Sequence, residues 1–343
     1  MAPTNKAAFY PSDKATSLQV GPSPYPTVGE GELIVKVGVT AINPVDWKIQ
    51  QLGQDLFPTL QYPLAGGHDI AGTVVEVGPG VTRFRPGDRV LGFPAGFESR
   101  TGGFQHYVVV PAQLAAPIPD SVAFADAAVL PSCLATAAEA LYAYLGLDRP
   151  ADPPRPRNGK TVLVSAGASA VGSNAIQLAV ASGYEVFTTA SPKNFAHCEA
   201  LGASQVFDYR DPNVARDLKE AFRGKQCAGG FAAVEESNAL VFDVVAASEG
   251  SKSVACAILF SSEGVPKDIS AKMISAFAIK DTDLVDVIFG KFLPEALAKG
   301  HYQCVPKALV VGQGLDHVQA AFDKGMTNSV SCQKLVVSLE ENA

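Results

Sequence analysis

Thr161–Ala179 reads TVLVSAGASAVGSNAIQLA, and this stretch decides how the middle of the chain folds. An apolar run, Thr161–Val164, passes through a turn of small residues directly into a segment with the composition of a helix. Such a turn brings backbone N–H groups and the positive end of a helix dipole up to a pyrophosphate, and bulky side chains would hold the phosphates away. The spacing of small residues departs from a strict GxGxxG motif, and even a strict match would be weak evidence without its structural context. In its strand–helix context it predicts a dinucleotide-binding turn at Ala168, Ser169, Ala170, Val171 and Gly172.

The chain beyond this turn continues to alternate strands and helices. The predicted helix ends at Gly183, and we expect strands at 184–190, 205–209, 230–237 and 253–260, with helical segments between the first three. This alternation is typical of βαβ units around a parallel sheet.

The flanking parts of the chain have a different pattern. Glu32–Ile42 and Ile70–Gly78 are β-branched runs separated by Gly- and Pro-containing turns, which predict a small antiparallel, barrel-like domain. An Ala- and Leu-rich helix is expected after Pro131, followed by a proline-rich surface loop at Asp148–Gly159. Beyond Asp283 the pattern predicts a helix, a strand, a second helix and a last strand.

The end of the second predicted strand bears on the choice of nucleotide. An acidic residue there would bind the ribose 2′-hydroxyl and select NAD. The strand ends TTASPKN (188–194), without a carboxylate, so Ser191 is positioned to donate to a 2′-phosphate and Lys193 to add positive charge. Tyr209 is a candidate partner for the adenine or the phosphate. SPKN is also an ordinary helix N-cap, and both interpretations hold together because a cap exposes the same N–H groups. The sequence therefore favours NADPH.

Composition limits the class of protein. The 343 residues are 47% hydrophobic and 18% charged, with a net charge of −7, which indicates a globular protein with no basic patch for nucleic acid or an anionic membrane. No uninterrupted apolar run approaches the ~20 residues of a membrane span, and the N-terminus lacks the pattern of a secretory signal. The six cysteines are dispersed and read as reduced thiols of a cytoplasmic protein.

Several motifs together resemble a known superfamily. AINPVDWK (41–48), GHDIAGTVVEVG (67–78), PGDRV (86–90), the turn quoted above and a final KLVV occur in the order found in medium-chain dehydrogenase/reductases. TTASPKNF, QVFDYRDPN, VVGQGLDHV and QKLVV are most similar to the zinc-independent quinone oxidoreductase and enoyl reductase branch. That branch includes the fungal trans-acting enoyl reductases that serve polyketide synthases.

The resemblance implies an α/β fold with two domains. A GroES-like barrel catalytic domain would come from residues 1–133 and 283–343. A Rossmann-type, doubly wound parallel sheet would be inserted at 134–282 and bind NADPH. These expectations agree with the strand and helix pattern described above.

His68 raises the question of zinc, because catalytic zinc sites take three protein ligands and keep an open position. In zinc-dependent relatives a cysteine stands near the position of Asp46, and none is present here. Phe93–Phe104 also lacks the four cysteines of a structural zinc lobe, and Cys133 has no cysteine partner nearby in sequence. We therefore expect no metal.

Without a Lewis acid, a conjugated C=C–C=O is easier to reduce than a simple ketone, because hydride adds at the β-carbon and donors can stabilise the enolate oxygen. The resemblance implies that Lys48 and Thr136 are catalytic, and that Thr136, Leu141 and Tyr142 contact substrate. Lys48 could equally be a solvated surface lysine, and periodicity alone places most of the Thr136–Tyr142 helix in the core. Trp47 either lines the pocket or packs in the barrel.

The cofactor residues carried over from the family form one set. They are Val45, Asp46, Trp47, Lys48, Thr136, Ala168, Ser169, Ala170, Val171, Ser191, Lys193, Asn194, Tyr209, Leu259, Cys332 and Gln333. The remaining histidines, His106, His197, His301 and His317, have no chemical constellation in the sequence, and packing or surface roles suffice for them.

The expected function is NADPH-dependent reduction of an enoyl thioester or enone, in fungal secondary metabolism. The alternatives are an NADPH quinone oxidoreductase and a non-catalytic NADPH-binding protein. Expected partners are a small-molecule or carrier-bound acyl substrate and a polyketide synthase, with the chain a monomer or homodimer and no nucleic acid or membrane bound.

Overall fold

The computed structural model describes residues 3–327 and 329–340. Contacts divide the chain into two compact units. The first unit comprises Met1–Ser132 and Lys307–Ala343, and the second comprises Cys133–Pro306. Each unit is described by itself below.

The first unit is built on a seven-stranded sheet to which both ends of the chain contribute. The strand order is β15 (Lys307–Gln313), β16 (Gln333–Ser338), β3 (Glu32–Ala41), β5 (Asp69–Val77), β6 (Arg89–Gly92) and β8 (Ala115–Pro117), with β7 (Tyr107–Pro111) paired to β3. Apart from β15 and β16, which are parallel, these strands pair antiparallel. The antiparallel domain predicted for the first third of the chain is therefore present.

A smaller sheet and helices pack against the larger sheet of this unit. The sheet has the order β2 (Gln19–Ser23), β1 (Asn5–Tyr10) and β4 (Leu64–Ala65). The helices include α1 (Pro44–Leu52) and α9 (His317–Met326). Leu33, Ile70, Phe104 and Phe322 are fully buried in one core that joins these elements.

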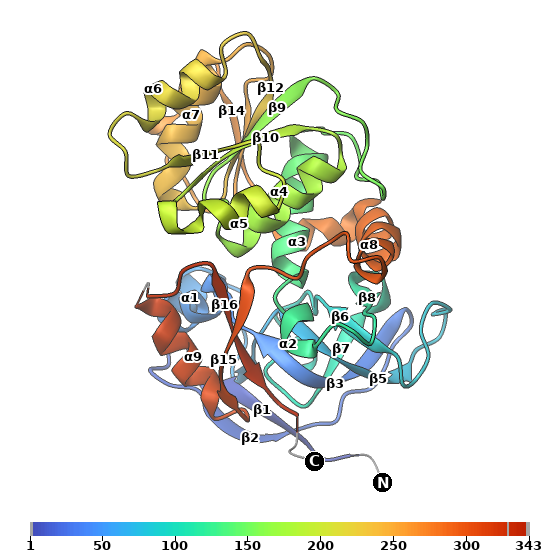
Figure 1. The fold of residues 1–343 in the computed structure, drawn as a ribbon. Coiled ribbons are helices and arrows are strands. Elements are labelled where there is room, and N and C mark those ends of the chain that lie inside the picture. The colour runs from blue at the N-terminus through green and yellow to red at the C-terminus, as the bar shows by residue number, and fades with distance from the viewer. Residues whose placement is uncertain (1–2, 328, 341–343) are drawn as a thin grey trace. The chain divides into compact units, whose positions relative to one another are not determined.

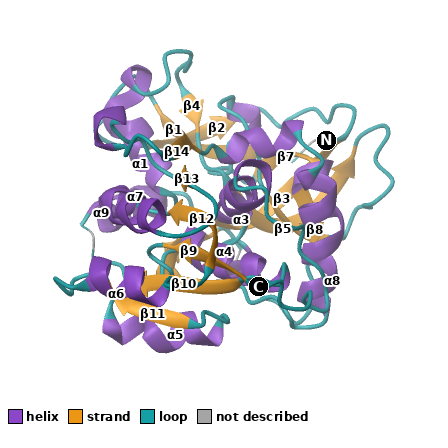
Figure 2. Cartoon of the chain, turned by 90° about the horizontal axis from the view of Figure 1, so that it is seen from above, coloured by secondary structure: helices purple, strands orange, loops and turns teal. Residues whose placement is uncertain are grey.

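The second unit contains a six-stranded parallel sheet. Its order is β11 (Gln205–Asp208), β10 (Glu185–Ala190), β9 (Lys160–Val164), β12 (Gln226–Ala232), β13 (Ser253–Cys256) and β14 (Ser270–Met273). Numbered along the chain, this is the order 3-2-1-4-5-6 of a doubly wound dinucleotide-binding fold. Figure 2 shows β9, β10 and β11 running side by side. The predicted parallel sheet is therefore confirmed.

Helices cover both faces of this sheet. They are α4 (Ala170–Ala181), α5 (Phe195–Ala200), α6 (Val214–Ala221) and α7 (Asn238–Ala247). Right-handed crossovers put α4 and α5 on one face and α6 and α7 on the other, and Figure 1 shows each pair together. Almost every residue of α4 is buried, so its apolar sequence reflects burial on nearly all sides.

The helix expected after Pro131 changes its geometry along its length. It comprises α3 (Pro131–Ala138), which continues directly into a π-helical turn at Glu139–Tyr144, and a separate short helix, α2 (Phe124–Ala127), precedes it. Among the described residues, Phe124–Tyr144 alone is long and apolar enough to cross a membrane by length and composition, and 72% of its most apolar window is buried in the protein. That burial is the pattern of a core helix rather than a membrane span.

The observed return to the first unit is later than the predicted boundary at residue 283. A π-helical segment at Asp286–Phe292, helix α8 (Leu293–Ala298) and the loop after it remain in the second unit. The Tyr302 hydroxyl donates to Asn174 Oδ1 at 2.6 Å, and the Gln303 N–H donates to Gln177 Oε1 at 2.8 Å. These bonds to α4 hold the segment on the second unit, so the chain re-enters the first unit only at Lys307.

Candidate functional site

The turn between β9 and α4 has the geometry that its sequence predicts. Ser169 is the N-cap of α4, and its Oγ accepts the Gly172 N–H at 3.0 Å. Ala166 adopts a positive φ of 50°, an uncommon conformation for a residue with a side chain. A Cβ at Gly172 would lie 2.2 Å from the Ala166 carbonyl oxygen, so glycine is required there. The turn thus presents backbone N–H groups at the start of α4 with no bulky side chain in front of them.

The carboxyl ends of β9 and β12 lie beside this turn, at the point where the strand order reverses. The Ala233 N–H donates to Ser165 Oγ at 3.0 Å, and Ser165 Oγ lies 2.6 Å from Ser237 Oγ. Asn238, next to Ser237, is 8% exposed, and its Oδ1 has no hydrogen-bond partner among the described residues. A buried amide oxygen without a partner is costly, so an acceptor for a bound ligand is the natural account. These residues fit a dinucleotide.

Asn238 was not among the sequence-predicted site residues. The signal was available, because the predicted strand at 230–237 ends in the polar residues Glu235, Glu236 and Ser237, and Asn238 continues them. In a doubly wound sheet, residues at that position line the ligand crevice.

The end of β10 carries the residues predicted to bind a 2′-phosphate. Asn194 Nδ2 donates to Ser191 Oγ at 3.1 Å, which leaves the Ser191 hydroxyl proton available for an acceptor. Lys193 is exposed and makes no hydrogen bond or ion pair with the part of the chain that the structure describes. Tyr209, after β11, is 55% exposed. The neighbouring Arg210 is engaged with Asp208, at 3.1 Å between Nε and Oδ1.

His197 has a partner that the sequence did not reveal. Its Nε2 lies 2.9 Å from Ser173 Oγ, and the Ser173 hydroxyl donates to the Gly167 carbonyl oxygen at 2.9 Å. Because the Ser173 proton is used on Gly167, His197 Nε2 is the donor in this pair. Partial burial lowers the pKa of the imidazole. His197 therefore ties α5 to the phosphate turn.

The predicted substrate residues follow one another along α3 and the π-helical turn. Thr136 is partly exposed on α3, whereas Leu141 is fully buried. The Tyr142 hydroxyl donates to the Leu178 carbonyl oxygen at 3.1 Å and lies 3.0 Å from Ser182 Oγ, both at the end of α4. Periodicity placed this helix in the core, and the burial of Leu141 and Tyr142 agrees with that. Their contact with substrate stays a prediction.

Three further predicted cofactor residues lie on loops or strand ends. Leu259 is 61% exposed in the segment after β13. Cys332, directly before β16, has a positive φ of 53°, and Gln333 is the exposed first residue of that strand. Their roles stay predictions as well.

Helix α1 carries the NPVDWK motif. The Asn43 N–H donates to Asp46 Oδ2 at 2.7 Å, which fixes the first turn of the helix. Trp47 packs against α9, since a Cβ at Gly325 would lie 2.6 Å from its ring. Val45 also packs on the core of this unit. Lys48 is half-buried and makes no hydrogen bond or ion pair with the described residues.

His68 and Asp46 form a buried pair in the first unit. His68 Nδ1 lies 3.2 Å from Asp46 Oδ1, and the Tyr10 hydroxyl donates to the Asp46 carbonyl oxygen at 2.9 Å. Burial raises the pKa of the Asp46 carboxyl, and the neighbouring His68 partly offsets this effect. Gly67 before His68 has φ of 96°, and a Cβ there would lie 2.9 Å from the Phe104 nitrogen, so the turn needs glycine.

Asp69 is the most heavily bonded carboxylate of this unit's buried cluster. Its oxygens accept Asn43 Nδ2 at 2.8 Å, the Ser132 N–H at 2.6 Å and the Ser132 hydroxyl at 2.9 Å. Lys334, 5% exposed, forms a close ion pair with the same carboxylate. Sequence reasoning missed Ser132 and Lys334. The signal for Lys334 was a lysine at an inward position of the apolar strand KLVV.

The donor set does not fit a catalytic zinc ion. Zinc needs three protein ligands around an open position. Both oxygens of Asp46 are occupied by Asn43 and His68, and those of Asp69 by Asn43, Ser132 and the Lys334 ammonium. Within residues 3–327 and 329–340, no three His, Cys, Asp or Glu side chains are grouped to hold a metal ion.

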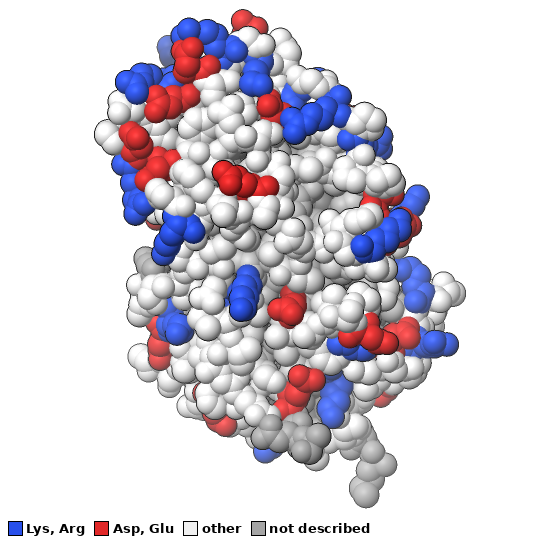
Figure 3. Space-filling view, viewed as in Figure 1, with Lys and Arg blue, Asp and Glu red and all other residues white. Residues whose placement is uncertain are grey.

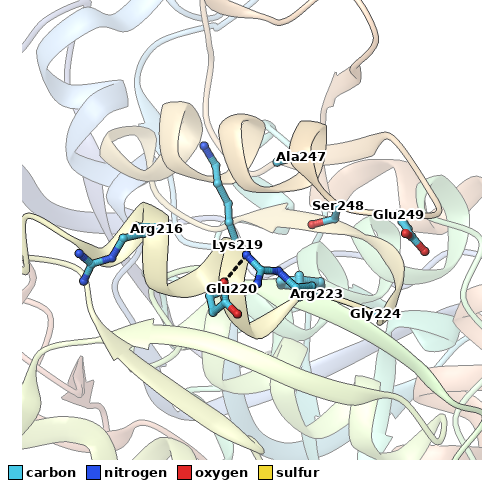
Figure 4. Close-up of a pocket in the computed structure, with 9 residues that line it drawn as sticks. Arg216, Lys219, Glu220, Arg223, Gly224, Ala247, Ser248 and Glu249 are labelled. Carbon is cyan, nitrogen blue, oxygen red and sulfur yellow. Dashed lines mark ion pairs between the residues drawn. The ribbon is translucent and has the colours of Figure 1, made fainter.

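A surface hollow of about 530 Å³ lies between the C-terminal ends of α6 and α7 (Figure 4). Its basic groups already have partners, with Arg223 paired to Glu220 at 2.5 Å, Lys219 to Asp243 at 2.7 Å and Arg216 to Asp217 at 2.9 Å. These helix ends lead into the amino ends of β12 and β13, the opposite edge from the dinucleotide turn. On the face shown in Figure 3, basic and acidic side chains are interspersed. We assign no site to this hollow.

Comparison with known proteins identifies the family. A model described as "Alcohol dehydrogenase GroES-like domain" matches residues 29–120, and one described as "Zinc-binding dehydrogenase" matches residues 170–300. Dehydrogenase azaJ of Aspergillus niger is 46% identical, with 98% of this chain and 99% of the relative covered. Trans-enoyl reductase himH of Aspergillus japonicus is 38% identical, with 98% of each chain covered.

A solved structure agrees along the whole length. The alcohol dehydrogenase superfamily protein from Novosphingobium aromaticivorans has a TM-score of 0.79 and 25% identity, covering 98% of this chain and all of that chain. The chain belongs to the medium-chain dehydrogenase/reductase superfamily. Within it, the chain groups with fungal dehydrogenases and trans-enoyl reductases, and it is an oxidoreductase that binds a nicotinamide cofactor.

Proposed function

We propose that this oxidoreductase is an NADPH-dependent, zinc-independent reductase of activated carbon–carbon double bonds, acting on an enoyl thioester or an enone. The observation that carries the proposal is the buried cluster around His68 and Asp69. Its carboxylate oxygens are occupied by protein donors and an internal ammonium group, so this donor set offers no Lewis acid for a simple ketone. An activated double bond does not need one.

The choice of NADPH rests on the end of β10. The strand ends at Ala190, and Ser191, Pro192, Lys193 and Asn194 follow without a carboxylate. A carboxylate at this place would repel a 2′-phosphate, whereas the Ser191 hydroxyl and the unpaired Lys193 ammonium attract it. The N–H groups at the start of α4 would hold the pyrophosphate, and Asn238 Oδ1 would accept a hydrogen bond from a ribose hydroxyl.

The cofactor, when bound, supplies the hydride. The chain has to orient the acceptor and to meet the negative charge that develops on the enolate oxygen. Lys48, which has no polar partner among the described residues, offers an ammonium group, and Thr136 offers a hydroxyl on α3. The proton for the α-carbon comes from an acid or from water.

The relatives support the enoyl acceptor, because a relative at 38% identity is named a trans-enoyl reductase. We extend the proposal to an acyl substrate presented free or on a carrier, with a polyketide synthase as the partner, in fungal secondary metabolism. The enzyme would work in the cytoplasm as a monomer or a homodimer. Co-elution with the synthase tests the partner, and light scattering of the purified chain tests the oligomeric state.

The test of the reaction is NADPH oxidation by the purified protein with three acceptor classes: short enoyl thioesters, simple enones and simple quinones. Turnover of the thioesters or enones without turnover of quinones supports the proposal. Turnover of quinones alone makes the chain a quinone oxidoreductase. Tight NADPH binding without turnover of any acceptor makes it a binding protein.

A metal analysis tests the zinc component separately. We expect far less than one zinc per chain, and no loss of activity after treatment with a chelator. Stoichiometric zinc whose removal abolishes turnover would refute the zinc-independent assignment.

A further inference from the structure

Three segments far apart in the chain meet on the Asp69 carboxylate. Asn43 is the N-cap of α1, Ser132 is the second residue of α3, and Lys334 is the second residue of β16. Each donates to Asp69, at 2.8 Å from Asn43 Nδ2, 2.6 Å from the Ser132 nitrogen, and in a close ion pair from Lys334. One buried carboxylate therefore fixes the starts of two helices and a strand.

Each of these segments carries a residue predicted to bind the cofactor. Asn43 begins the helix that carries Lys48. Ser132 precedes Thr136 by four residues, so the two share a face of α3. Lys334 directly follows Gln333. The Asp69 carboxylate thus makes a direct hydrogen bond or ion pair with each of the three segments, α1, α3 and β16.

Asp69 is itself held firmly in place. It begins β5, its carbonyl oxygen accepts the Thr40 hydroxyl at 3.1 Å, and it pairs with Ala41 across the sheet. The Lys334 ammonium also donates to the Val129 carbonyl oxygen at 3.3 Å, in the segment that leads into α3. Lysine is rarely buried unless it is paired, and burial of this ion pair is costly. We attribute the retention of this costly buried ion pair to a requirement that the segments bonded to it be placed precisely.

We infer that Asp69 and Lys334 are positioning residues of the reductase, which set the placement of Lys48 through Asn43, of the first turn of α3 through Ser132, and of Gln333 through its neighbour Lys334. The inference rests on the proposed function. It predicts a larger effect on hydride transfer than on cofactor affinity, because the phosphate-binding turn and the Ser191 segment belong to the second unit, whereas this cluster belongs to the first. Misplacement of a reacting group by about 1 Å costs on the order of 10²-fold in rate.

The experiment uses four variants and three measurements. Asp69→Asn/Lys334→Met removes both charges and so avoids a buried unpaired ion. Ser132→Ala removes the hydroxyl, which contacts Asp69 Oδ2 at 2.9 Å and Asn43 Oδ1 at 3.2 Å, and keeps the backbone donor. Lys334→Arg keeps the charge. Arg100→Met is the control, because it breaks another ion pair of the same unit, with Glu32 at 2.7 Å. The measurements are the NADPH dissociation constant, kcat with an enoyl thioester, and the isotope effect with NADPH deuterated at the transferred position.

For the double variant we expect a kcat that is roughly 10- to 100-fold lower, an isotope effect larger than that of the wild type, and an NADPH dissociation constant within about threefold. Ser132→Ala should change kcat and the isotope effect in the same direction by less. Lys334→Arg should retain most of the rate, and Arg100→Met should match the wild type.

Loss of thermal stability in the double variant and in Ser132→Ala, with unchanged kcat per folded enzyme and an unchanged isotope effect, would show that the cluster is merely structural and would overturn the inference. If the double variant does not fold, Ser132→Ala and Lys334→Arg decide by the same readouts. A wild-type enzyme that turns over no enoyl thioester or enone would instead refute the proposed function, which separates the two failures.

Discussion

Lys334 and Asp69 stand 265 positions apart in the chain and form a buried ion pair in the first unit. The pair belongs to a cluster in which each carboxylate oxygen of Asp46 and Asp69 has a donor. The surroundings of His68 are therefore a hydrogen-bonded polar network that contains one internal ion pair. Its members connect the chain segments that carry the predicted chemistry.

Ser191→Asp should reverse the preference for NADPH over NADH. The new carboxylate would repel a 2′-phosphate and accept a bond from a ribose 2′-hydroxyl. We expect the NADPH dissociation constant to rise at least about tenfold, which corresponds to ~1.4 kcal/mol. Fluorescence titration with both nucleotides measures it. Ser204→Asp, at the amino end of β11, is the matched control and should change neither constant. An unchanged ratio in Ser191→Asp would refute the 2′-phosphate assignment.

Asn238→Leu should weaken binding of both nucleotides without loss of stability. Since Asn238 Oδ1 has no partner among the described residues, replacing the amide removes a desolvation cost and no bond. We expect a roughly 5- to 10-fold weaker nucleotide affinity, or ~1 kcal/mol, by titration. The contrasting variant is Asn174→Leu, whose side chain donates to Ala170 and accepts from Tyr302. It should lower the free energy of unfolding by about 1–3 kcal/mol. If Asn238→Leu bound both nucleotides with wild-type affinity, Asn238 would not be part of the nucleotide site.

Lys48→Met should lower kcat far more than it lowers stability. The ammonium group has no hydrogen-bond or ion-pair partner in the described structure, so its loss should change the free energy of unfolding by less than about 0.5 kcal/mol. A donor to a developing enolate is worth about 10²-fold or more in rate. Steady-state kinetics and denaturant unfolding of the same sample test both halves. Kinetics equal to those of the wild type would show that Lys48 has no catalytic role and is a solvated surface lysine.

The Glu32–Arg100 pair should stabilise the first unit at neutral pH and lose that effect in acid. Arg100 donates to both oxygens of Glu32, at 2.8 and 2.7 Å, and this bonding holds the pKa of the carboxyl below its usual value. Because the folded pKa is the lower one, the stabilisation is present above the unfolded pKa of about 4.3 and disappears as the pH falls through the folded value. Wild type should exceed Arg100→Met by about 1 kcal/mol at pH 7. Unfolding at a series of pH values should show this difference shrinking below pH ~4, and an equal difference throughout would contradict the assignment.

Local signals in the sequence predicted the elements that depend on local chemistry. The turn at Ala168–Gly172 follows from small residues between an apolar strand and a helix, and the structure shows the Ser169 cap and a glycine that no other residue can replace. The alternating pattern likewise predicted the parallel sheet. Both are consequences of steric and capping rules that act over a few residues.

Features that depend on distant partners could not be predicted in this way. The bonds to Asp69 span 26, 63 and 265 positions in the chain, and nothing near Ser132 or Lys334 indicates a shared acceptor. The helices at 286–298 have an apolar face, but that pattern does not say on which unit it packs. The bonds of the following loop, from Tyr302 to Asn174 and from Gln303 to Gln177, answer that question only in the folded chain.

The strand β16 pairs with β3, at Val336 and Ala41, so the sheet of the first unit is completed by residues that are synthesised after the whole of the second unit. The second unit is continuous in the chain and its residues all leave the ribosome earlier. During synthesis the second unit can therefore fold first, while the end of β3 at Val39–Ala41 still lacks its β16 partner. A chain that stops before residue 333 would keep an exposed edge strand and a buried carboxylate without its counter-ion, and would be prone to aggregate.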